Sequence, residues 1–420
     1  MKNDTKTIAE NAFYGCKNLT KIIIPDSITD IGSYTFKGCT DLVEAIIGEC
    51  VTNIGSYAFS DCTSLIKIII PDSVTNIESY SFKGCTSLLE ITIPNSVTSM
   101  GINIFEDCTT LGKIAISDGV KDIGMHVFDG CTALTEITIP NGVVNISESA
   151  FENCTNLAKI TIPDSVTNIG DKAFYNTAYY SDVNNWKDNV LYINNHLIKS
   201  SDTISDDYII KNDTKSIADC AFYDCINLTK IVIPQGANSI GKSSFYNCES
   251  LAEVIIPDSI KTIGYNAFYN CNGLTEITIP SSVISIGGNA FTFCTNLKTV
   301  NITDIVAWCE IKFASSSSSP TCYAENIYLN GLPITEIIMP EDCTKINDYI
   351  FYNFKDLTSV TIPSSVTSIG YTVFEGCTNL KKVNITDISA WCKIDRKDYA
   401  SNPLRNGADL YLNGQIVFVK

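Results

Sequence analysis

The chain has 420 residues, of which 45% are hydrophobic and 18% charged, so it has enough apolar material for a large core. Its 29 basic and 46 acidic residues give a net charge of −17, which argues against binding to nucleic acid or to an anionic membrane surface. No apolar run approaches the ~18 residues that a membrane-spanning helix needs, so we expect no membrane insertion.

The chain repeats with a period of 23 residues. Phenylalanine marks this period at Phe13, Phe36, Phe59, Phe82, Phe105, Phe128, Phe151 and Phe174, then at Phe222, Phe245, Phe268 and Phe291, and again at Phe351 and Phe374. In most copies a Cys follows three residues after the Phe and a Leu three residues after the Cys, as in Phe36, Cys39 and Leu42. One such unit cannot bury its own apolar side, so we expect the units to stack as an elongated repeat solenoid.

Each repeat contains signals for short strands. Alternating apolar residues followed by a proline, as at Ile22, Ile24 and Pro25, predict a strand that ends at the proline, which cannot donate a ladder hydrogen bond. Stretches such as residues 73–77 predict a second short strand on the opposite wall. For the segment before each Phe we expect a single helical turn.

The repeat pattern P-x-S-V-T-x-I-G-x-x-A-F-x-x-C-T-x-L is clearest over residues 163–174 and 363–380. It resembles the BspA-type leucine-rich-repeat proteins over most of the chain. The resemblance implies a right-handed leucine-rich-repeat superhelix with short parallel strands on its concave face. It also implies an extracellular or cell-surface location and a binding role, with a protein or glycan partner such as a host extracellular-matrix protein. It transfers no ligand-binding residues, because the family has no fixed binding motif to match.

We expect residues 1–420 to form a single solenoid with irregular modules at 175–210, 301–333 and 384–420. In the first module, residues 190–199 predict a hairpin that turns at Asn194 and Asn195. The other two modules share short sequence motifs 83 residues apart, including Trp308 and Trp391. We expect Trp186, Trp308 and Trp391, one in each module, to anchor small local cores. The serine run at 315–319 is predicted to be a mobile loop. Residues 2–16 match residues 211–225, so the chain starts within a repeat and we expect it to be a fragment of a longer protein.

The 18 cysteines raise the question of disulfides or metal sites. Twelve lie on the 23-residue ladder, where neighbouring side chains point in parallel, so we expect buried packing thiols there. A Cys309–Cys322 bond across the serine run is left open, although the second module has no matching pair. No C-x-x-C occurs, and His126 and His196 are far apart in the repeat order, so we predict no metal site and no cofactor.

No catalytic motif stands out, and we predict that the protein is not an enzyme. Residues 236–243, GANSIGKS, match the phosphate-binding loop formally. However, Ile240 should be buried in the second short strand of its repeat, and the repeat leaves no room for the long helix that must follow such a loop. The chain contains neither G-x-S-x-G nor H-E-x-x-H, and its two histidines offer no nucleophile–base pair.

The outward strand positions are the candidate binding surface. The third position of each strand run alternates in charge through Lys21, Glu44, Lys67, Glu90, Lys113, Glu136 and Lys159. We expect this row to neutralise itself across adjacent strands. The fifth position carries Ile23, Ile46 and Ile69 and then changes to Thr92 and Ala115. Three exposed isoleucines flanked by Lys21, Glu44 and Lys67 are therefore the predicted ligand-contact surface.

Two explanations of the isoleucines remain open at this point. They contact a partner, or they reflect the β-propensity of Ile together with a missing coil at the N-terminal end. The sequence thus predicts a monomeric, non-enzymatic surface or secreted protein that mediates adhesion or protein or glycan binding. The alternative is a structural spacer, or stalk, that holds another domain away from a cell.

Overall fold

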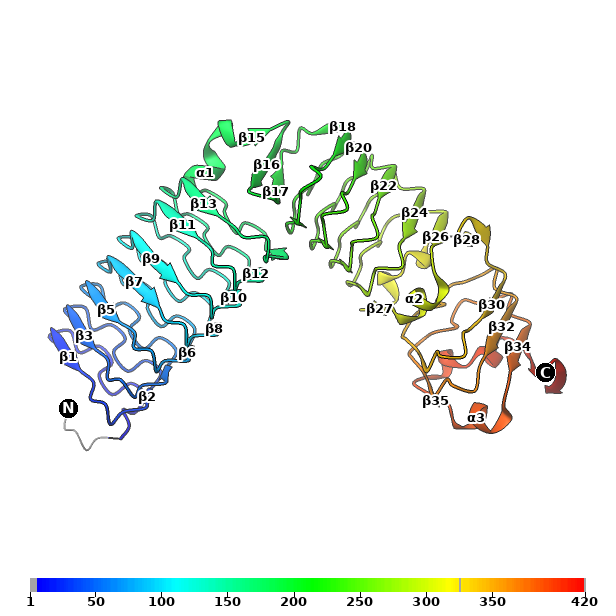
Figure 1. Ribbon diagram of the computed structural model, residues 1–420, viewed down its shortest axis with the longest axis horizontal. Coiled ribbons are helices and arrows are strands. Elements are labelled where there is room, and N and C mark those ends of the chain that lie inside the picture. The colour runs from blue at the N-terminus through cyan, green and yellow to red at the C-terminus, as the bar shows by residue number, and fades with distance from the viewer. Residues whose placement is uncertain (1–5, 325, 419–420) are drawn as a thin grey trace. The chain divides into compact units, whose positions relative to one another are not determined.

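The computed structural model describes residues 6–324 and 326–418 (Figure 1). The chain divides into two compact units, Met1–Ile198 and Lys199–Lys420, and each is a stack of coils with parallel strands. The predicted parallel-stranded repeat solenoid is therefore confirmed. That residues 1–420 form one domain stays a prediction, as does the concave curvature of the strand face.

In unit 1, each regular coil has one longer strand and one two-residue strand on a second wall. The longer strands are β1 (Lys21–Ile23), β3 (Glu44–Ile46), β5 (Lys67–Ile69), β7 (Glu90–Ile93), β9 (Lys113–Ile116), β11 (Glu136–Thr138) and β13 (Lys159–Thr161). The shorter strands are β2 (Asp30–Ile31), β4 (Asn53–Ile54), β6 (Asn76–Ile77), β8 (Ser99–Met100), β10 (Asp122–Ile123), β12 (Asn145–Ile146) and β14 (Asn168–Ile169). Because successive side chains of a strand point to opposite faces, Ile22 of β1 is buried while Lys21 and Ile23 are exposed.

Neighbouring coils pair in register. Ile23 of β1 lies opposite Ile46 of β3, and Ile46 lies opposite Ile69 of β5. The constant repeat length explains this register, because each position returns to the same place one coil later. The outward residues of the longer strands consequently form straight columns along the stack.

The core of each unit is filled by the repeat residues. Ring centroids of neighbouring ladder phenylalanines are 5.1 Å apart between Phe36 and Phe59 and 5.5 Å apart between Phe59 and Phe82, and all three rings are fully buried. The ladder cysteines lie beside these rings. The Sγ of Cys108 donates a hydrogen bond of 3.2 Å to the carbonyl oxygen of Phe82 on the preceding coil.

The segments before the ladder phenylalanines are tight turns, so the prediction of a helical turn was wrong. Two residues before the Phe, φ is +58° at Tyr34 and +57° at Tyr57, which is incompatible with a right-handed helix. Local turn bonds, as from Ala58 N to the carbonyl of Gly55 at 3.1 Å, stand beside backbone hydrogen bonds between coils, as from Tyr34 N to the carbonyl of Ser56 at 2.8 Å. The latter hydrogen bonds link the turns of neighbouring coils along the stack.

The irregular module at the end of unit 1 begins at helix α1 (Ala178–Ser181), which Thr177 caps in place of the ladder cysteine. It continues with the 3₁₀ turn η1 (Val183–Asn185), β15 (Trp186–Lys187), β16 (Val190–Ile193) and β17 (His196–Ser200). β16 and β17 are neighbours joined by Asn194 and Asn195, which confirms the predicted hairpin. Trp186 donates its indole N–H to the carbonyl of Tyr180 at 2.8 Å.

Unit 2 repeats the same coil design. Its longer strands are β18 (Ser205–Ile209), β20 (Asn227–Val232), β22 (Glu253–Ile255), β24 (Glu276–Ile279), β26 (Thr299–Ile302), β30 (Glu336–Ile338), β32 (Ser359–Ile362) and β34 (Lys382–Ile385). Its shorter strands are β19 (Ser216–Ile217), β21 (Ser239–Ile240), β23 (Thr262–Ile263), β25 (Ser285–Ile286), β31 (Lys345–Ile346) and β33 (Ser368–Ile369). Ile240 lies buried in β21, so the formal phosphate-loop match forms a strand and not a loop before a helix.

The two later modules share one order of elements. The first comprises α2 (Ile305–Glu310), β27 (Lys312–Phe313), the 3₁₀ turns η2 (Ser316–Ser318) and η3 (Pro320–Cys322), β28 (Asn326–Leu329) and β29 (Leu332–Pro333). The second comprises α3 (Ile388–Lys393), β35 (Asp395–Arg396), η4 (Tyr399–Ser401), η5 (Pro403–Asn406), β36 (Asp409–Leu412) and β37 (Gln415–Phe418). Trp308 and Trp391 are buried, which confirms that they anchor local cores.

The serine run is not a mobile loop, and that prediction was wrong. Ser318 and Ser319 are fully buried, and Ser315 and Ser318 form a reciprocal capping box around η2. Serine composition suggested solvation, but hydroxyl groups that bond to each other and to the backbone can be packed inside a protein.

Candidate binding face

The charged row on the longer strands of unit 1 is paired as the sequence predicted. The Nζ of Lys21 lies 2.7 Å from Glu44, and the Nζ of Lys67 lies 3.3 Å from Glu90. These pairs join adjacent strands, and their side chains are about half exposed. Such surface pairs contribute little stability each, and each pair has no net charge.

The predicted apolar stripe, Ile23, Ile46 and Ile69, is exposed on β1, β3 and β5. Ile69 is 68% exposed and Ile46 is 42% exposed, although strands pair with Ile46 on both sides. A missing coil at the N-terminal end therefore does not account for the exposure of Ile46. Its side chain is accessible because the fifth strand position points outward in every coil.

A second exposed apolar column accompanies the stripe, and our sequence analysis missed it. It consists of Val43, Ile66 and Leu89, each placed directly after the ladder Leu of its coil. Coil-to-coil hydrogen bonds hold it in register, from Ile66 N to Val43 O at 3.2 Å and from Leu89 N to Ile66 O at 3.1 Å. The sequence does contain a signal for this column, because the same position carries Thr, Gly or Ala in neighbouring repeats.

Together the two columns define the apolar patch, which consists of Ile23, Ile46, Ile69, Val43, Ile66 and Leu89. Along each of β3 and β5 the charged residue stands between the members of the two columns, as Glu44 does between Val43 and Ile46. The patch therefore consists of two parallel apolar columns, one on the strands and one just before them, with the row of paired charges between them. Patches of this kind on soluble proteins commonly mark interaction surfaces.

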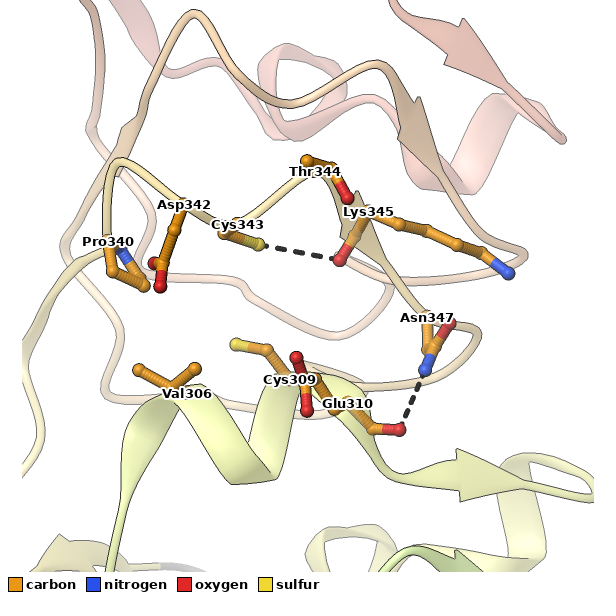
Figure 2. A pocket seen from close by; sticks show the side chains of 9 residues that line it. All are labelled: Val306, Cys309, Glu310, Pro340, Asp342, Cys343, Thr344, Lys345 and Asn347. Atoms are coloured by element: carbon orange, nitrogen blue, oxygen red, sulfur yellow. Dashed lines mark hydrogen bonds between the residues drawn. The ribbon is translucent and has the colours of Figure 1, made fainter.

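A separate pocket of about 220 Å³ lies in unit 2 between helix α2 and the turn that leads into β31 (Figure 2). Asn347 donates to the carbonyl of Glu310 at 2.9 Å, which fastens β31 to the end of the helix. Cys309 and Cys343 both line the pocket. Burial raises the pKa of both thiols, and a protonated thiol is a poor nucleophile, so the pocket offers no activated cysteine.

All 18 cysteines are free, including Cys309 and Cys322, whose pairing the sequence had left open. The ladder cysteines are buried as predicted, apart from Cys16 on the first coil, which is exposed. Burial raises the pKa of Cys39 to about 11 and the pKa of Cys154 to about 12. These side chains therefore pack and donate hydrogen bonds as neutral thiols.

Among the helices of the described residues, none combines the length and the apolar character required to cross a membrane.

Comparisons with known proteins agree with the repeat pattern. A family model described as the BspA type leucine rich repeat region matches residues 6–134, 100–213, 201–320 and 321–395. The comparison with curated proteins gave no significant match.

One similar solved structure is a leucine-rich repeat protein from Bacteroides ovatus, with 25% identity, 93% of this chain and 85% of that chain covered, and a TM-score of 0.43. Another is a leucine rich cell surface protein from Faecalibacterium prausnitzii, with 29% identity, 93% and 86% covered, and a TM-score of 0.39. Because the family model covers most of the sequence, the chain belongs to the BspA-type leucine-rich-repeat family.

Proposed function

We propose that this chain is a non-enzymatic binding module of a cell-surface or secreted protein, and that it docks a protein partner on the apolar patch of unit 1. The observation that supports this proposal most directly is the exposure of the Ile46 side chain. This residue has a strand on each side, yet its side chain remains open to solvent together with five other apolar side chains. Leaving such a group hydrated is unfavourable, and covering it on binding returns the hydrophobic free energy.

The chemistry of the patch favours a protein over a glycan. Its side chains are aliphatic, so they offer no hydrogen bonds to sugar hydroxyls and no aromatic ring on which a sugar could stack. The flanking Lys21–Glu44 and Lys67–Glu90 pairs are already satisfied and present no net charge to a strongly charged ligand. The best complement is a partner that presents apolar groups to both columns and polar groups to the charged row between them.

The test is binding of the immobilised chain to a panel of extracellular-matrix proteins and glycans at physiological salt. A saturable protein ligand is expected, and Ile46→Asp should abolish its binding because it buries a carboxylate in an apolar contact. Thr138→Asp is the matched control, since Thr138 occupies the same repeat position on β11, is exposed and lies outside the patch.

The outcomes separate the two functional classes. Loss of binding in Ile46→Asp with normal binding in Thr138→Asp supports docking on the patch. Equal binding by both variants and the wild type would place the contact elsewhere. No saturable ligand in the panel would favour a spacer role, in which the stack serves only to set a distance.

A further inference from the structure

We propose that His126, Asp129 and Glu152 form a binding site for a divalent transition-metal ion, with Zn²⁺ as the best match. One potential ligand atom from each residue lies within 4.8 Å of the other two, and all three side chains are partly exposed at the surface of unit 1. Two coils supply them, because His126 and Asp129 flank Phe128 whereas Glu152 follows Phe151. The inference is independent of the apolar patch.

The spacing of the first two ligands already suits one ion. The Nδ1 of His126 lies 3.0 Å from Oδ2 of Asp129. Ligands that bind one Zn²⁺ at ~2.0–2.2 Å in a tetrahedron lie about 3.3 Å apart. On binding, Nδ1 supplies its lone pair and the ring proton resides on Nε2. The side chain of Glu152 makes no hydrogen bond or ion pair with any described residue, so it can turn toward the ion without breaking one.

A neighbouring amide orients the Asp129 carboxylate. The Nδ2 of Asn153 donates to Oδ1 of Asp129 at 3.0 Å, which leaves Oδ2 facing the imidazole. Hydrogen bonds of this kind to metal-ligating carboxylates fix their direction and raise metal affinity.

The position directly after each ladder Phe forms a column along the stack, and its charges change at the proposed site. The residue after the ladder Phe is Lys83, Glu106, Asp129 and Glu152 on four successive coils. Lys83 lies 2.6 Å from Glu106 and neutralises it. Asp129 and Glu152 bring two carboxylates together, and among the described residues the only basic group paired with either is His126. Two carboxylates and a neutral imidazole match the charge of a divalent cation.

The surroundings are acidic beyond these three residues. Asp107 lies on the preceding coil, its backbone N–H donates to the carbonyl of Asp129 at 2.8 Å, and its carboxylate lies beside Gly130. The local potential is therefore negative, which favours the approach of a cation.

The ligand set selects the class of metal. An imidazole nitrogen with carboxylate oxygens suits Zn²⁺ and similar transition metals, whereas Ca²⁺ and Mg²⁺ prefer oxygen ligands alone. Three protein ligands leave the fourth position of a tetrahedral ion to water. Because Glu152 belongs to the next coil, a bound ion would fasten two coils of unit 1 together.

The site is tested by calorimetric titration of Zn²⁺ alone into the full, reduced chain after metal removal. We expect one ion bound per chain, with affinity reduced about 100-fold or more in Glu152→Gln and in His126→Gln, since outer-sphere partners alone cost about 10–100-fold. Asn153→Ala should cost about tenfold by the same principle. Glu375→Gln is the matched control, because Glu375 also follows a ladder Phe but lies in unit 2.

Imidazole spectra of histidine-labelled protein provide a second readout that the cysteines do not affect. The chain has only His126 and His196, and His196 is fully buried against the carbonyl of Pro163. Zn²⁺ should shift one set of imidazole signals, and that set should be the one missing in His126→Gln. Unchanged His126 signals, equal affinity in Glu152→Gln and wild type, or thiolate absorption on Co²⁺ binding would each overturn the proposal.

Discussion

The Sγ of Cys62 donates a hydrogen bond to the carbonyl oxygen of Phe36, 3.2 Å away on the preceding coil. The same oxygen accepts the backbone N–H of Cys39 at 3.1 Å. A buried carbonyl has two lone pairs, and here one is satisfied within its own coil and the other by the next coil. The repeat cysteine is thus a donor that links neighbouring coils as well as a small apolar side chain.

Removing one ladder thiol should destabilise the stack. Cys108→Ala loses the bond to Phe82 and leaves a small void, so we expect a loss of about 1–2 kcal/mol in the free energy of unfolding. Urea titration followed by circular dichroism measures this loss. Cys392→Ala, at an exposed cysteine of α3, should have almost no effect, and equal effects of the two variants would contradict the role assigned to the thiol.

Truncating a ladder ring should cost more. The ring of Phe128 is fully buried between Phe105, at 5.6 Å, and Phe151, at 5.1 Å. Phe128→Ala should lower the free energy of unfolding by about 3–5 kcal/mol. Phe293→Ala provides the comparison, because that ring is half exposed and should cost less than about 1 kcal/mol. An unchanged melting temperature in Phe128→Ala would show that the ring is not part of the core.

Thiol labelling of the native protein should separate the cysteines by position. Cys16, Cys50 and Cys392 are exposed and should react with iodoacetamide at mildly alkaline pH. Burial raises the pKa of Cys154 to about 12, so its thiolate is scarce and its sulfur is also shielded. Mass spectrometry of digested samples reads out the modified positions. Labelling of Cys154 as fast as Cys50 without denaturant would contradict this arrangement.

The ion pairs of the strand face should be weak and sensitive to salt. A double-mutant cycle on Lys67 and Glu90, whose charged atoms are 3.3 Å apart, should give a coupling of about 0.2–1 kcal/mol. Because both side chains are about half exposed, the coupling should fall at high ionic strength. A coupling that persists in concentrated salt would indicate that the pair is shielded from solvent.

Acidification should remove a contribution made by Asp398, which caps η4. Burial alone would raise the pKa of Asp398, but hydrogen bonds from Ser401 and Thr372 outweigh it and hold the pKa below its ordinary value. A lowered pKa means that the stabilisation is present above the unfolded pKa of about 3.9 and is lost as pH falls through the folded value. The stability advantage of the wild type over Asp398→Asn should therefore shrink between neutral pH and about pH 3. Unfolding titrations of both proteins at the two pH values measure it, and a constant difference would contradict the assignment.

The strand columns were predictable because the period is constant. Ile23, Ile46 and Ile69 are separated by one repeat length each, and equal lengths of coil bring equal positions into register. The charged row followed from the same rule. The column of Val43, Ile66 and Leu89 obeys the same rule, but it lies just before the strands, and only the outward strand positions were compared between repeats.

Buried hydroxyl groups and residues that meet only across coils were harder to place. Ser318 and Ser319 looked solvated by composition, but their burial depends on hydroxyl partners brought in by the fold. Asp129 and Glu152 are one repeat length apart, so they become neighbours on adjacent coils. A search for metal ligands by motifs of closely spaced residues does not detect such a pair.

The bond from ten of the twelve ladder cysteines to the Phe of the preceding coil also constrains how such a chain can change in length. Where the cysteine ladder stops, other side chains donate to the carbonyl of the last Phe. The hydroxyl of Thr177 donates to the carbonyl of Phe174 at 2.9 Å, and the amide of Asn406 donates to the carbonyl of Phe374 at 3.3 Å. Deleting or duplicating one whole period within the regular stack joins a donor to an equivalent acceptor and orphans no group. Deleting only part of a period would shorten the 26-residue spacing between donor and acceptor at the deletion and displace that thiol from its carbonyl. Gene rearrangements in such a sequence are therefore tolerated in whole repeats, and the irregular modules are the natural places for the series to end.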